Sequence, residues 1–140
     1  MNVANLDLCK ELYGLSGWYA QHFWYCKKSK SEDLWSIEEE PLLADDENNI
    51  PAYDLGFLLR KLPHNITPKD KRYSTGSHLE LHNQSMDKSE SLGGGISHCW
   101  CAMYRSTYGH LAIEHADTPE DAVCKLAIEL FKQGIIKKEK

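Results

Sequence analysis

The stretch that decides the fold is DTPEDAVCKLAIELFKQG, residues 117–134, in the last quarter of the chain. Thr118 is a typical helix N-cap, Pro119 suits a first turn, and Gly134 suits the residue that follows a helix. Apolar residues recur at the spacing of one helix face, namely Val123, Leu126, Ala127, Leu130 and Phe131. The stretch therefore predicts an amphipathic helix that packs against a sheet.

Two shorter helices are predicted earlier in the chain. Asn5 suits the N-cap of a helix over about residues 5–14, which Gly14 would end. Pro51 suits the first position of a second helix over about residues 51–62. The apolar stripe of this second helix consists of Leu55, Leu58, Leu59 and Leu62.

Strand patterns fill most of the remaining chain. Residues 73–83, 96–106 and 109–116 have the composition of strands, and the short STYG sequence between the last two predicts a hairpin. The polar, glycine-rich residues 84–95 predict a flexible connection. Residues 21–27 suit another strand, and the residues around Leu34 and Ile37 suit a short one.

These elements predict one domain over residues 1–140, in the order helix, strand, an optional short strand, helix, three strands, helix. The expected fold class is α+β, with helices packed on a mostly antiparallel sheet of about four strands.

The charge is unevenly distributed. The net charge is −5, which disfavours direct binding to nucleic acid or to anionic membranes. Residues 31–49 form an acidic segment with eight Asp or Glu residues and no Lys or Arg. No signal peptide or membrane span is recognisable, so we expect a cytosolic protein whose five cysteines stay reduced.

Three stretches together resemble a known family. They are LDLCKELYGLSGW (residues 6–18), PAYDLGFLLRKLP (51–63) and ADTPEDAVCKLAIELFKQG (116–134), about 45 residues in all. They are similar to small tailed-phage and prophage proteins of unknown function, the phage ABA sandwich domain family. The resemblance implies a helix–sheet–helix sandwich and the cytoplasm of an infected bacterium. It implies no catalytic residues.

The His- and Cys-containing strands raise the question of a metal site. In HLELH, a period of two places His78, Glu80 and His82 on one face, and Leu79 and Leu81 on the core face.

We expect Cys99 and Cys101 to share the core face with the two leucines, and His98 and Trp100 to share the outer face with the histidines. A mixed His/Cys site is then excluded, and the remaining metal alternative is His78, His82 and His98. No cofactor is expected.

Two other chemistries are less well supported by the sequence. His78 and His110 each begin a His-Leu pair, but the Ser or Thr that a two-histidine phosphoesterase needs is replaced by Glu80 and Ala112. A nucleotide could instead stack on aromatic side chains with basic residues beside it. The candidates for that binding are Trp24, Trp35, Lys69, Lys71 and Arg72.

The leading hypothesis is a non-enzymatic phage accessory protein that binds a host bacterial protein and inhibits a defence system such as CRISPR. The alternatives are a module that sequesters a phosphate-bearing signalling nucleotide, and a metal-binding protein. The oligomeric state is left open. The candidate partner-binding residues are Glu38, Glu39, Glu40, Asp45, Asp46, Glu47, His78, Glu80, His82, His98 and Trp100.

Overall fold

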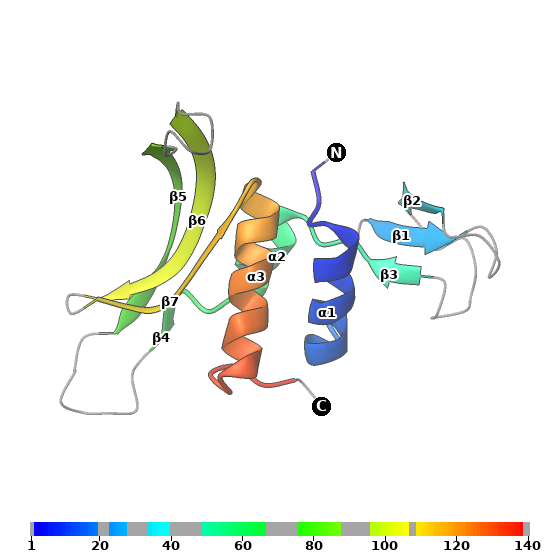
Figure 1. The fold of residues 1–140 in the computed structure, drawn as a ribbon. Helices are drawn as coiled ribbons and strands as arrows, with labels where there is room; N and C mark the ends of the chain where they lie inside the picture. The colour runs from blue at the N-terminus through cyan, green and yellow to red at the C-terminus, as the bar shows by residue number, and fades with distance from the viewer. Residues whose placement is uncertain are drawn as a thin grey trace.

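A C-terminal helix, α3, lies in the middle of the fold, between a four-stranded sheet and α1, with α2 behind it (Figure 1). In this computed structural model the described residues are 2–19, 23–27, 34–39, 49–66, 76–87, 96–106 and 109–138, without the side chains of 85–87 and 96–98. The elements are α1 (Leu6–Ser16), β1 (Trp24–Lys27), β2 (Trp35–Glu38), β3 (Asn49–Pro51), α2 (Leu55–Lys61), β4 (Asn65–Ile66), β5 (Ser77–Asp87), β6 (Ile96–Ser106), β7 (Gly109–Ala116) and α3 (Pro119–Lys132).

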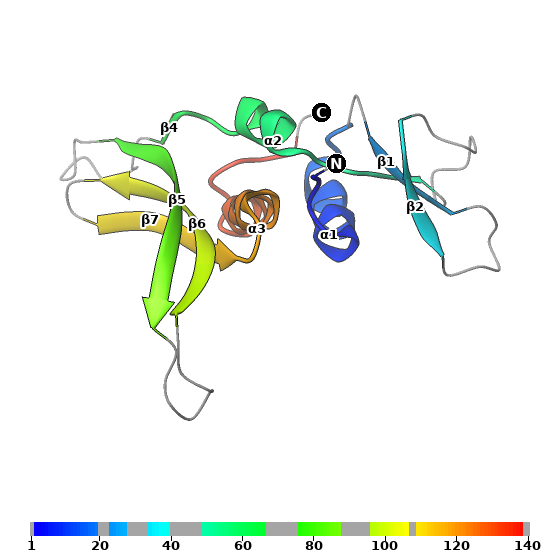
Figure 2. The same ribbon diagram turned by 90° about the horizontal axis from the view of Figure 1, so that it is seen from above.

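The strands form two antiparallel sheets. One has the order β4-β5-β6-β7 and the other the order β2-β1-β3. Viewed from above, the three helices lie between the two sheets (Figure 2). The predicted α+β class is confirmed, as is the predicted hairpin of β6 and β7, in which Ser106 pairs with Gly109.

The helix–sheet–helix order that the family resemblance implies differs from this arrangement. Among the described residues, all three helices lie on the same side of the four-stranded sheet (Figures 1 and 2). The second sheet was not foreseen, because β3 is only three residues long and no alternation can be recognised at that length.

Helix α3 has the caps that its sequence predicts. The Thr118 side chain accepts a hydrogen bond from the Asp121 N–H at 3.1 Å. Beyond the last turn Gly134 has φ +74°, a conformation that favours glycine, and the Ile135 N–H donates to the Leu130 carbonyl at 2.9 Å. These two local motifs set the ends of the helix.

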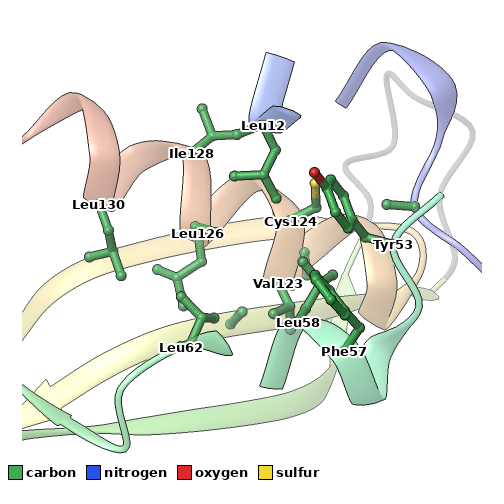
Figure 3. Packing of buried hydrophobic residues seen from close by; sticks show 14 of the residues in the cluster. Leu12, Tyr53, Phe57, Leu58, Leu62, Val123, Cys124, Leu126, Ile128 and Leu130 are labelled. Carbon is green, nitrogen blue, oxygen red and sulfur yellow. The ribbon is translucent and has the colours of Figure 1, made fainter. Parts of the chain in front are cut away.

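Apolar residues surround α3 on more than one side. Figure 3 shows Leu12 of α1 near Ile128 and Cys124, and Leu58 of α2 and the α2 C-cap Leu62 near Val123 and Leu126. The helix therefore packs on α1 and α2 as well as on β6 and β7. Its buried apolar residues are Ala122, Val123, Cys124, Leu126, Ala127, Ile128 and Leu130.

The boundaries of the two other helices differ from the prediction. Asn5 does cap α1, but the helix continues past Gly14 to Ser16, and Gly17 supplies the left-handed C-cap at φ 67°. Helix α2 begins at Leu55 and not at Pro51, because the Asp54 side chain accepts from the Phe57 N–H at 2.7 Å.

Two predicted loop or helix segments are strands. Pro51 belongs to β3, where it pairs with Trp24. Strand β5 begins at Ser77 and runs to Asp87, so it includes residues 84–87 of the predicted flexible connection; residues 88–95 lie outside the described residues. None of the described helices is long and apolar enough to cross a bilayer.

Replacing Leu126 with Ala should lower the free energy of unfolding by about 2–5 kcal/mol. The Leu126 side chain on α3 is fully buried, and its truncation leaves a cavity in the core. Leu34→Ala is the matched control, since Leu34 is 77% exposed and its loss should cost less than about 0.5 kcal/mol. Urea denaturation followed by circular dichroism measures both. Equal losses in the two variants would contradict the central role of α3.

Candidate functional site

The four-stranded sheet has one face that no described helix or strand covers (Figures 1 and 2). The registers of β5, β6 and β7 arrange nine side-chain positions on it in three rows of three. The rows are His78–Arg105–His110, Glu80–Met103–Ile113 and His82–Cys101–His115. We call these nine residues the outer face.

The predicted side of β6 is wrong. His82 pairs with Cys101, and Asn83 pairs with Trp100, so Cys101 lies on the histidine side of the sheet. Trp100 packs against the core cluster on the helix side, together with Leu79 and Leu81. Trp100 is therefore not a candidate for partner binding on the outer face.

The inward side of β6 was predicted wrongly because both faces of this strand are apolar. Hydrophobicity alone therefore does not decide which alternate residues turn toward the core. The large residues decide it. Tyr104 is fully buried and its hydroxyl donates to the Pro63 carbonyl at 2.7 Å. Residues two apart share a face, so Trp100 and Ala102 turn inward with Tyr104, and Cys101 and Met103 turn outward.

Glu80 joins two histidines on the outer face. His78 Nε2 lies 3.1 Å from Glu80 Oε1, and His82 Nε2 lies 3.3 Å from Glu80 Oε2. The hydrogen bonds from His78 and then His82 hold the pKa of Glu80 below its usual range. Arg105 Nη1 is 4.0 Å from Glu80 Oε2, which is beyond hydrogen-bond distance. The carboxylate thus orients both imidazole rings.

Apolar groups occupy the middle of the outer face. Cys101 is 0% exposed and Met103 is 8% exposed, while Ile113 is half-buried. Burial raises the pKa of the Cys101 thiol, with a smaller contribution from Cys99. A protonated, covered thiol is a poor nucleophile. Cys101 acts here as a small apolar residue between His82 and His115.

The metal alternative is not supported by the described residues. Among them, no group of three or more His, Cys, Asp or Glu side chains is placed to hold a metal ion. His98 was the third proposed ligand; its strand position pairs with Ser85, and its side chain lies outside the described residues.

A cavity of about 440 Å³ lies where β7 ends and α3 begins. Two of its polar groups already have partners within the fold. The Asp121 carboxylate accepts from the Asn5 backbone N–H at 2.7 Å, and Lys125 Nζ donates to the His115 carbonyl at 3.1 Å. The lining is Asn5, Cys99, His115, Ala116, Asp117, Asp121 and Lys125. These contacts join α1, α3 and β7.

The acidic segment is described only in part. Glu38 ends β2 and accepts a hydrogen bond from the Ser36 hydroxyl at 3.1 Å, and Glu39 is exposed. The remaining acidic candidates, Glu40, Asp45, Asp46 and Glu47, lie outside the described residues.

The two candidate stacking tryptophans differ in accessibility. Trp24 is buried against Tyr19, with ring centroids 4.8 Å apart, so it is not available to stack on a ligand. Trp35 is partly exposed, and two ammonium groups lie near its ring: Lys10 Nζ at 4.9 Å and Lys27 Nζ at 5.0 Å from the centroid.

The sequence did not single out Lys10 or Lys27, since only the packing of α1 near β2 brings Lys10 to this ring. The basic candidates Lys69, Lys71 and Arg72 lie outside the described residues.

Comparisons of the chain with protein-family models, curated proteins and solved structures give no match.

Replacing both His78 and His82 with Ala should return the pKa of Glu80 to its ordinary value of 4.5, because both hydrogen bonds to the carboxylate are lost. Carbon-13 NMR of the carboxyl group measures the change.

In the wild-type protein the Glu80 pKa is lower in the folded chain than in the unfolded chain. Its stabilising contribution is therefore present above the unfolded pKa and is lost as the pH falls through the folded value. The control His115→Ala should leave the Glu80 pKa unchanged, and an unchanged pKa in the double variant would show that the two histidines do not set it.

Proposed function

We propose that this protein acts by binding a protein partner through the outer face. The observation that carries the proposal is the arrangement of its nine residues. Ile113 is half-buried and lies beside Met103, which is 8% exposed, and polar or charged residues occupy six of the other positions. Protein interfaces commonly have this anatomy, with an apolar centre and a polar rim.

The rim indicates the chemistry of the partner. It carries Arg105 and four histidines, against a single carboxylate, Glu80, which two of those histidines already contact. The guanidinium and imidazole N–H donors then favour a partner surface with hydrogen-bond acceptors, such as carboxylates, around an apolar contact.

We extend the proposal to the setting of the partner. The phage resemblance supports a protein of a bacterial host, reached in its cytoplasm, and inhibition of a defence system such as CRISPR as the outcome of binding. The acidic segment would make a separate contact with a basic groove of a host protein, through Glu38 and Glu39 among its described residues, because β2 lies across the helices from the outer face (Figure 2).

The test is affinity capture from a bacterial lysate with three forms of the full chain. The wild type should retain a partner that His115→Glu and Ile113→Lys lose by about tenfold or more, because the first reverses a rim contact and the second places a charge in the apolar middle. Gln133→Lys is the matched control, since Gln133 is exposed at the end of α3.

Captured proteins count only where the two outer-face variants lose them and the control keeps them, with thermal unfolding confirming that all forms fold. Equal capture by all forms would reject the outer face. Changing Glu38, Glu39 and Glu40 together to Lys tests the acidic segment separately, and unchanged capture would remove it from the interface.

A second candidate function is sequestration of a nucleotide, and Trp35 is the observation that favours it. The ammonium groups of Lys10 and Lys27 lie 4.9 Å and 5.0 Å from the centroid of this partly exposed indole ring. An aromatic ring beside cations is a common platform for a base and its phosphate.

Thermal unfolding against a panel of mono-, di- and cyclic nucleotides tests this candidate. A ligand present at 100 times its dissociation constant should stabilise the protein by about 2.7 kcal/mol. Trp35→Leu should abolish the shift, whereas Tyr19→Leu, at another exposed aromatic residue, should preserve it. A flat response to every nucleotide would reject this function.

A further inference from the structure

A β-bulge changes which residue of β7 lies beside Arg105. Tyr104 pairs with Ala112, so a regular ladder would pair Arg105 with Leu111. The register instead shifts between Tyr104 and Arg105, and Arg105 pairs with His110. Leu111 packs against the core cluster. The bulge therefore places a histidine, and not a leucine, in the first row of the outer face.

Bulges often re-aim side chains beside functional sites. Here the result is a guanidinium with an imidazole on either side, because His78 pairs with Arg105 across β5 and β6. Adjacent strands lie about 4.8 Å apart, so the three side chains lie within reach of one small ligand.

The hydrogen-bond donors of His78, Arg105 and His110 make few contacts with other side chains in the described part of the chain. The Arg105 side chain is 62% exposed, and its ion pair with Glu80 is 4.0 Å long. The His110 side chain is exposed and has no hydrogen bond to a described residue. His78 uses Nε2 for Glu80, which leaves Nδ1 for another partner.

We propose that Arg105, flanked by His78 and His110, forms a subsite of the outer face that binds a phosphate group carried on a side chain of the protein partner. The guanidinium offers a planar pair of N–H donors that matches two phosphate oxygens, and the imidazoles approach from the two neighbouring strands. A tetrahedral oxyanion has enough acceptor oxygens for all three groups. The phosphorylated source rests on the proposed function, whereas the oxyanion site does not.

Glu80 should weaken the binding of phosphate at this subsite. Its carboxylate lies 4.0 Å from Arg105 and would repel an incoming oxyanion. Replacing Glu80 with Gln should therefore tighten phosphate binding. If the cluster had only a structural role, the same substitution would not change the affinity for phosphate.

The experiment is NMR titration of the full chain, observing the Arg105 Nε–H group and the histidine rings. The probes are inorganic phosphate, a phosphoserine peptide and AMP, each against sodium chloride at the same ionic strength. We expect saturable shifts at Arg105, His78 and His110, and none at His115, which lies two rows away.

Arg105→Gln and His110→Gln should each weaken phosphate binding by about tenfold or more, since each removes a hydrogen bond to a charged group. His115→Gln is the matched control and should bind phosphate as the wild type does. Glu80→Gln should bind several times more tightly. The subsite is overturned if the shifts do not saturate, if His115 responds equally, or if Arg105→Gln binds as the wild type does.

The peptide and nucleotide arms distinguish the sources of the phosphate. Tightest binding of the phosphoserine peptide supports a phosphorylated partner, and tightest binding of AMP overturns that source. Phosphate binding in a protein whose outer-face variants still capture the same partners would reject the proposed function and leave the subsite standing. If partner capture depends on the outer face but no phosphate binds, the proposed function stands and the phosphate subsite is rejected.

Discussion

The burial of α3 from several sides is the constraint on which the rest of the structure depends. A helix with a single apolar stripe needs only one sheet to cover it. In α3, Cys124 and Ile128 lie outside the stripe of Val123, Leu126 and Leu130, and they are buried as well. The sheet covers one side, α1 covers the opposite side, and α2 packs alongside (Figure 2). The helices are therefore interior, and the sheet must turn one face away from them.

The outer face follows from this arrangement. Because all the described helices lie on one side of the four-stranded sheet, the alternate residues of β5, β6 and β7 have no helix to pack against. Antiparallel sheets tolerate such a face when polar residues line it. Here the polar residues are mostly histidines, and Met103 and Ile113 remain among them. The proposed interface would use Ile113 as its apolar contact and the surrounding imidazoles and guanidinium as its polar contacts.

Features that depend on residues close together in the chain, such as helix caps and turns, were predicted best from the sequence. The caps at Asn5 and Thr118 and the turn at Gly134 were recognisable because each involves atoms a few residues apart. The start of α2 was misplaced because Pro51 and Asp54 both suit a helix start, and only the pairing of β3 with β1 decides between them. The side of β6 was wrong because its apolar residues occur in both phases.

The candidate site was predictable only within a strand. The grouping of His78, Glu80 and His82 follows from a period of two and is confirmed by their hydrogen bonds. The neighbours contributed by β6 and β7 depend on register, and residues 109–112 contain no local pattern that predicts the bulge that brings His110 beside Arg105. The approach of Lys10 to Trp35 depends likewise on packing between distant elements.

The hydrogen bond from Asn5 to Asp121 spans 116 positions of the chain. At synthesis rates of about 5–20 residues per second, roughly 6–23 s separate the emergence of these two residues from the ribosome. During that interval Cys9 and Leu12 on α1 have no α3 to cover them. Closing such long loops also slows folding after synthesis. The helix that the core needs most is thus made well after α1, and until then the nascent chain carries an uncovered apolar surface that a chaperone would recognise.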